Sequence, residues 1–160
     1  MVSAYEQAMT WVSRMLLVPA VVYLVVLMLF VVLQRRVIYY PATLTRDVAE
    51  QVARETGSDP WRNAAGQVVG WHWPARGPTP DAVLIVHGNA GSALDRDYLA
   101  APLRDAAAVD VFVLEYPGYG VRAGVPTESS LLAASDEAIT LLAGRRIHVG
   151  EAWWCGPSER

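Results

Sequence analysis

The chain has 160 residues, enough for one domain and an appendage. Its 13 basic and 16 acidic residues give a net charge of −3, and this mild balance gives no indication of a nucleic-acid partner. Cys155 is the one cysteine, which excludes an intrachain disulfide and fits a reducing compartment.

An uncharged apolar stretch at residues 15–33 is the first predicted element. A helix of about 20 apolar residues spans the hydrocarbon core of a bilayer. Trp11 precedes the stretch and Tyr39 and Tyr40 follow it, at the positions where aromatic rings favour the membrane interface. The sequence therefore predicts a single-pass transmembrane helix whose partner is membrane lipid.

Two other readings of this stretch are a secretory signal peptide and a buried core helix. A signal peptide would have a shorter apolar core and a basic start, whereas this start carries Glu6. A core helix would show a polar face. Arg35, Arg36 and Arg46 follow the span and only Arg14 precedes it, so the positive-inside rule predicts a cytoplasmic location for the rest of the chain.

The chain divides into three predicted regions. Residues 1–36 form the tail and anchor, residues 37–66 form a linker, and residues 67–160 form an α/β domain. Within the linker, two valines four residues apart among charges predict a short amphipathic helix at residues 46–55. Residues 57–60, Gly-Ser-Asp-Pro, end it.

Strand-like and helix-like segments alternate through the third region. Each crossover is long enough for a parallel βαβ unit, which predicts a doubly wound, mostly parallel sheet with ligands at the carboxyl ends of its strands. Thr127 is the expected N-cap of the second helix. Its expected apolar face consists of Leu131, Leu132, Ala138, Ile139 and Leu142. The expected elements are strands at 67–73, 81–86, 109–115 and 146–149, helices at 94–107 and 127–143, and a loop at 74–80.

Two glycine-rich loops follow predicted strands. In the first, residues 87–91 (His-Gly-Asn-Ala-Gly), we expect Gly88 and Gly91 to allow backbone angles that aim N–H groups inward. An ordinary strand-to-helix turn and a phosphate-binding loop are the alternatives, although the full G-x-G-x-x-G pattern is absent. The second, residues 115–126, is interpreted either as a structural turn covered by tyrosine rings or as a pocket lining.

Together these segments resemble the α/β-hydrolase superfamily, and most closely its membrane-anchored serine hydrolases with an HGNAG loop. The resemblance covers about residues 34–149. The matching residues are 35–41 (Arg-Arg-Val-Ile-Tyr-Tyr-Pro), Gly70, Trp71, His87 to Gly91, Tyr116, Gly118, Tyr119, Gly120, Gly124, Pro126 and Glu128.

The resemblance implies serine-nucleophile hydrolysis of an ester, thioester or amide in a small acyl substrate, without a metal or cofactor. It also implies an oxyanion hole. The backbone N–H of Asn89 would be one donor, and the second would come from the residue after the nucleophile, which is Trp153.

The sequence departs from this family at the nucleophile elbow, G-x-S-x-G. Residues 150–154 read Gly-Glu-Ala-Trp-Trp, so Ala152 occupies the serine position. His72, His87 and His148 all precede the elbow, whereas the family's acid and histidine follow it. Cys155 and Ser158 are the remaining nucleophiles, and neither has an evident base. We therefore expect a truncated or frameshifted, inactive form.

Two further expectations follow. The alternative function is a non-catalytic, membrane-anchored pseudo-hydrolase that binds a lipid-like ligand or a protein; a nucleotide-binding role would need phosphate ligands at Gly88 and an acidic ribose partner. The strand at 146–149 would also become an exposed apolar edge, which favours self-association of the chain.

Overall fold

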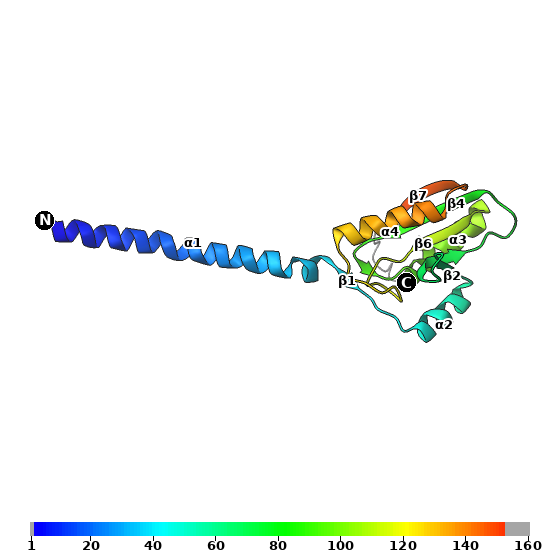
Figure 1. The fold of residues 1–160 in the computed structure, drawn as a ribbon, viewed down its shortest axis with the longest axis horizontal. Helices are drawn as coiled ribbons and strands as arrows, with labels where there is room; N and C mark the ends of the chain where they lie inside the picture. Colours follow the sequence, from blue (N-terminus) through cyan, green and yellow to red (C-terminus); the bar gives the residue numbers. More distant parts are fainter. Residues whose placement is uncertain (1, 153–160) are drawn as a thin grey trace, which may run out of the picture. The chain divides into compact units, whose positions relative to one another are not determined.

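The computed structural model describes residues 2–152, which form two compact units divided between Ile38 and Tyr39 (Figure 1). The first unit is one helix, α1 (Val2–Ile38). Its segment Arg14–Ile38 is long and apolar enough to cross a membrane. The expected apolar helix is confirmed, while its insertion in a membrane and the side on which the rest of the chain lies stay predictions.

The second unit is built around a mixed five-stranded sheet with the strand order β2-β3-β6-β4-β7. The strands β6 (Asp110–Leu114), β4 (Asp81–His87) and β7 (Arg146–Ala152) are parallel to one another. The strands β2 (Asp59–Arg62) and β3 (Val68–Trp73) are antiparallel to their neighbours.

The expectation of a mostly parallel sheet is therefore wrong for two of the four strand pairings in the five-stranded sheet. The turn at residues 63–67 joins β2 to β3, and the loop at residues 74–80 leads on to β4. Both connections are too short to carry the chain back for a parallel strand, so β2 is antiparallel to its neighbour β3, and β3 is antiparallel to β4 and therefore to β6, which lies between them. The mixed α/β class itself is confirmed.

Helices cover both faces of this sheet, so the second unit has three layers (Figure 1). On one face lie α2 (Arg46–Thr56), the short 3-10 helix η1 (Leu94–Arg96) and α3 (Asp97–Ala107). On the other lies α4 (Glu128–Leu141). The three helices expected in this part of the chain are confirmed, as is Thr127 as the N-cap of α4.

The strand β6 shows how two-residue periodicity separates the two cores. Val111 and Val113 pack toward α2 and α3, whereas Phe112 and Leu114 pack toward α4. All five β6 residues are buried. A strand covered on both faces reads as a continuous apolar run, which is the pattern that predicted it.

The apolar face expected for α4 is wrong at two positions. Leu132 and Ile139 are exposed, and the buried residues are Ala134, Ala138 and the C-cap residue Leu142. Small alanines let the helix lie close to the sheet, where larger side chains would be excluded.

Three short strands were not predicted. Residues 59 and 60, expected to end α2, begin β2, and Trp61 of that strand is buried. The strands β1 (Tyr40–Pro41) and β5 (Ala90–Gly91) form a separate two-stranded parallel sheet. Ala49 and Ala53 of α2 belong to the core, so part of residues 37–66 packs into the second unit.

The strand β7 is an edge of the sheet as far as the described residues extend. It pairs with β4 along its whole length, from Arg146 opposite Asp81 to Ala152 opposite His87. Self-association through this edge stays a prediction.

A buried carboxylate, Asp110, joins several segments at the end of the sheet where β6 begins. It accepts hydrogen bonds from the Ala75 amide at 2.8 Å and from His72 Nε2 at 3.0 Å, and it pairs with Arg145. Burial acts to raise the pKa of Asp110, but these hydrogen bonds outweigh it and hold the pKa below the ordinary value.

Replacing Asp110 by Asn should lower the free energy of unfolding at pH 7 by about 1–3 kcal/mol, because it removes a charged partner of Arg145. Because the pKa of Asp110 is lower in the folded chain, its carboxylate stabilises the fold at pH values above the ordinary pKa of 3.8. This stabilisation is lost as the pH falls below that value. Asp110→Asn should therefore flatten the acid side of the stability curve, measured by urea unfolding followed through tryptophan fluorescence.

The matched control is Asp81→Asn, which removes the surface pair between Asp81 and Arg146. An exposed pair contributes less than about 1 kcal/mol. Equal losses of unfolding free energy in the two variants would contradict this role for Asp110. So would an Asp110→Asn variant whose stability falls with decreasing pH as steeply as that of the parent chain.

Candidate functional site

Three segments that are distant in sequence meet at one end of the sheet. The loop at residues 88–91 follows β4, the loop at residues 115–126 follows the neighbouring parallel strand β6, and β7 ends beside β4. The register of β7 pairs Ala152 with His87, so the residue expected at the nucleophile position lies beside the start of the first loop. The second oxyanion candidate, Trp153, lies outside the described residues.

Hydrogen bonds fix the backbone on both sides of Asn89. The Gly88 carbonyl oxygen lies 2.8 Å from His87 Nδ1, and the Asn89 carbonyl accepts from the Tyr40 amide at 2.8 Å and the Tyr119 hydroxyl at 2.9 Å. In a trans peptide, the Asn89 N–H points opposite to the Gly88 carbonyl. Holding the two carbonyls therefore fixes the direction of the N–H that was expected to bind an oxyanion.

A buried acid lies beneath this loop. The side chains of Glu115 and His87 are fully buried, with 3.6 Å between Oε1 and Nε2, and the Ala93 amide donates to Oε1 at 3.0 Å. A carbonyl can only accept, so His87 Nδ1 carries a proton for Gly88. His87 Nε2 and Glu115 Oε2 have no hydrogen-bond partner among the described residues, so the contact between the two side chains is an ion-pair contact at 3.6 Å and not a hydrogen bond.

The sequence reading gave Glu115 no role. The signal available was an acidic residue directly after the apolar run at residues 111–114, because such a residue is rarely buried without a partner. Its partners come from elements more than twenty residues away in sequence, so the sequence did not reveal them.

Two glycines are required by this geometry. Gly120 has φ +51°, and a Cβ there would collide with the Glu115 carboxylate. Gly91 has φ +83°. The expectation for Gly88 is wrong, because its φ is not positive and a Cβ at Gly88 would meet no atom within 4 Å.

The tyrosines of the second loop pack on the His87 ring. The ring centroids of Tyr116 and Tyr119 lie 4.9 Å and 5.2 Å from that of His87, in edge-on contacts. Gly118, with φ +88°, turns the chain between the two tyrosines. Burial, with smaller effects from Tyr39 and Tyr116, raises the pKa of Tyr119 to about 12, so its hydroxyl stays protonated and donates to Asn89.

The segment at residues 40–44, which we call the strap, joins the two loops. The Ala42 amide donates to the Gly91 carbonyl at 3.2 Å in the first loop. In the second loop, the Gly120 amide donates to Ala42 and the Leu44 amide donates to the Gly120 carbonyl, both at 2.8 Å. The strap begins two residues after α1 ends, so the candidate site depends on the residues that directly follow the apolar helix.

The other expected residues lie elsewhere. His72 binds Asp110 at the opposite end of the sheet, and His148 is an exposed residue of β7. Cys155 and Ser158 fall outside the described residues. Within residues 2–152, no group of three or more His, Cys, Asp or Glu side chains is placed to hold a metal ion.

Comparisons with known proteins give two related sequences and no assigned activity. No family model matches the chain, and no solved structure matches it. Uncharacterized proteins from two strains of Mycobacterium tuberculosis are 33% and 34% identical to it over 114 residues, which is 70% of this chain. The chain spans about 40% of the length of these relatives.

Replacing Ala42 by Pro should loosen the first loop, because proline cannot donate to the Gly91 carbonyl. Losing one hydrogen bond should raise amide exchange across residues 88–93 about fivefold, measured by hydrogen–deuterium exchange on the full chain in detergent.

Thr43→Pro is the matched control, since the Thr43 amide donates to no described residue. If both variants exchange equally, or if neither differs from the parent chain, the strap does not hold the loop.

Proposed function

We propose that the second unit is of the α/β-hydrolase type and binds the carbonyl or oxyanion of an acyl group through the Asn89 N–H, without covalent turnover. The observation that carries this proposal is the fixed Asn89 backbone at the junction of β4, β6 and β7. An oxyanion site needs donors that are already oriented before charge develops, because reorientation would cost free energy during the reaction.

The absence of turnover rests on Ala152. In the family that the sequence resembles, a serine at this position attacks an ester, thioester or amide carbonyl. The register beside His87 supports Ala152 as the equivalent position. A methyl side chain has no lone pair with which to attack, so the site can polarise a carbonyl but cannot form an acyl-enzyme.

An alkyl fluorophosphonate probe should leave the purified full chain unlabelled, because the probe reacts only with an activated nucleophile. Butylphosphonate, a tetrahedral anion, should shift the amide resonances of Asn89 and Ala90 in nuclear magnetic resonance spectra. Asn89→Pro, which removes the backbone donor, should abolish these shifts, measured at Ala90.

The matched control is Asn89→Ala, which keeps the backbone N–H and should retain binding. Covalent labelling of the chain would contradict the claim of inactivity. Absence of shifts in the parent chain, or equal loss of binding in Asn89→Pro and Asn89→Ala, would contradict the role of the Asn89 amide.

We also propose that α1 anchors the protein in a membrane with the second unit on the cytoplasmic side. Its apolar length supports insertion, and Arg35 and Arg36 in its last turn support this orientation.

The single cysteine, Cys155, permits a direct test of orientation. In intact spheroplasts, a membrane-impermeant maleimide should leave Cys155 unmodified, because the bilayer separates the reagent from the cytoplasm. Permeabilised cells should be labelled, and this labelling serves as the control for thiol reactivity. Equal labelling before and after permeabilisation would place the second unit outside.

A further inference from the structure

A cavity of about 390 Å³ lies on the α2 face of the sheet, where α2, β2 and β3 meet the loop after β6. Its volume falls in the range of small-molecule sites. Asn89 is not among its lining residues, so it is separate from the candidate site. The residues that give it charge and shape are Arg46, Glu50, Arg62, Trp71, Pro117 and Arg122.

Two arginines give the cavity its free positive charge. Arg46 and Arg62 are exposed, and neither has an ion-pair partner among residues 2–152. One nitrogen of Arg62, Nη1, donates to the Gly66 carbonyl at 2.9 Å, which leaves its other N–H groups for a ligand. Glu50 is the one acidic residue in the lining, so the free charge favours an anion.

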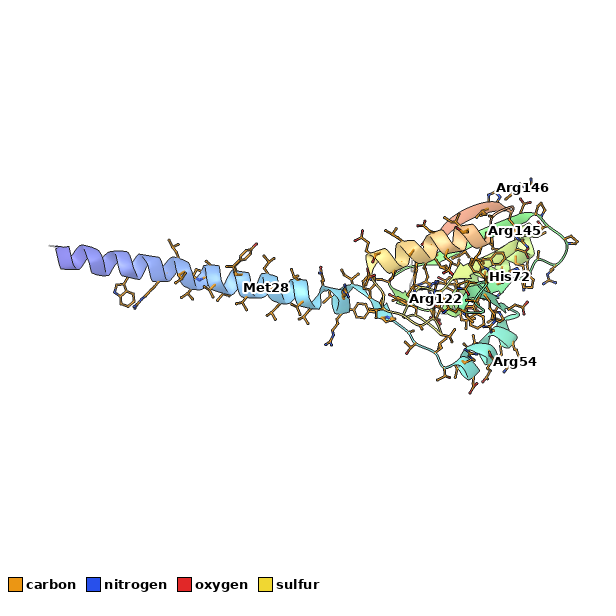
Figure 2. All side chains as sticks on the ribbon, viewed as in Figure 1. Met28, Arg54, His72, Arg122, Arg145 and Arg146 are labelled. Carbon is orange, nitrogen blue, oxygen red and sulfur yellow. The ribbon has the colours of Figure 1, made fainter. Side chains whose placement is uncertain are left out.

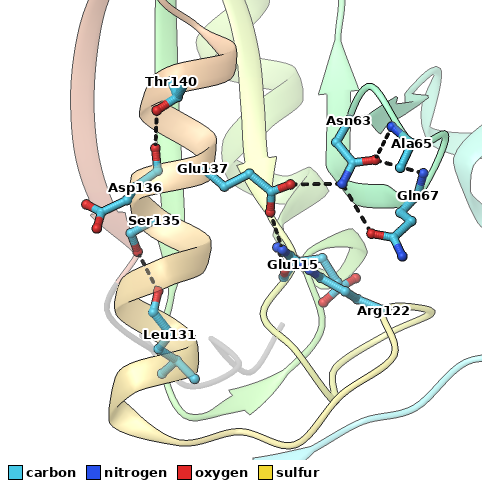
Figure 3. Close-up of polar contacts among 10 residues, drawn as sticks. All are labelled: Asn63, Ala65, Gln67, Glu115, Arg122, Leu131, Ser135, Asp136, Glu137 and Thr140. Atoms are coloured by element: carbon cyan, nitrogen blue, oxygen red, sulfur yellow. Dashed lines mark hydrogen bonds and ion pairs between the residues drawn. The ribbon is translucent and has the colours of Figure 1, made fainter.

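The walls of the cavity are held in place by a polar network (Figure 3). Arg122 donates to Glu137 at 2.6 Å and to the Glu115 carbonyl at 2.8 Å. Glu137 also accepts from Asn63 at 2.8 Å, and Asn63 accepts the amides of Ala65 and Gln67. The turn on one side of the cavity is thereby tied to the loop on the other, so the site is formed before a ligand arrives.

Trp71 supplies an aromatic surface. It is 2% exposed, and its indole N–H has no acceptor among the described residues. This N–H is itself almost inaccessible, so the ring lines the cavity without offering its donor to a ligand. Pro117 and Ala49 add apolar surface, which suits a ligand with an organic part beside its charge.

We infer that this cavity binds a phosphate ester. Guanidinium groups match the geometry of phosphate oxygens, and two unpaired arginines on separate elements, α2 and β2, can hold one phosphate between them. The ester comes either from a soluble phosphorylated compound or from the headgroup of an anionic phospholipid.

Isothermal titration of the full chain in non-ionic detergent tests both sources, with glycerol 3-phosphate as the soluble probe and dioctanoyl phosphatidic acid in mixed micelles as the lipid probe. Arg46→Gln and Arg62→Gln should each weaken the binding of whichever probe binds by about fivefold. Glu50→Gln should strengthen it about twofold, because it removes the opposing charge, an effect that damage to the fold would not produce.

Arg54→Gln is the matched control, because Arg54 belongs to α2 but does not line the cavity (Figure 2). Binding of one probe alone identifies the source and supports the inference. Failure of both probes to bind, or equal weakening in Arg54→Gln, would overturn it. Asn89→Pro should leave this binding unchanged, so the result is independent of the proposed function.

Discussion

The candidate site depends on the hydrogen bonds that hold the peptides flanking Asn89. His87 fixes the carbonyl before this residue, and Tyr40 and Tyr119 fix the carbonyl of the residue itself. Each of these partners is held by something else: His87 by the buried Glu115, Tyr119 by burial, and Tyr40 by its place in β1. A backbone donor that cannot rotate can stabilise charge on a ligand without first losing conformational freedom.

The same constraint explains why the segment after the apolar helix matters. The strap contributes backbone groups to both glycine-rich loops, and it begins two residues after α1 ends. Any event that pulled residues 40–44 from these loops would release Asn89 and Gly120 together. The cavity of the further inference has an additional support, the Arg122–Glu137–Asn63 network, which ties the loop after β6 to the turn between β2 and β3.

Apolar periodicity was enough to predict α2, α3, α4 and the strands β3, β4, β6 and β7, because an element that packs against others needs the matching residue pattern. It could not predict β1 and β5, whose two residues each pair through backbone atoms and leave no period in the sequence. The apolar face predicted for α4 included Leu132 and Ile139, which are exposed, because the sequence pattern does not show which side of the helix faces the sheet. The loops of the site were found from their glycines. The contacts of Glu115, Tyr40 and Tyr119 could not be predicted from the sequence, because they join residues that are far apart in it.

The most direct measurement of the central claim is a crystal structure of the full chain with butylphosphonate bound. The account predicts a phosphonate oxygen about 3 Å from the Asn89 nitrogen, with the His87 and Tyr119 contacts to the flanking carbonyls intact. A ligand that lies away from Asn89, or a Gly88–Asn89 peptide turned so that its N–H faces the interior, would contradict it.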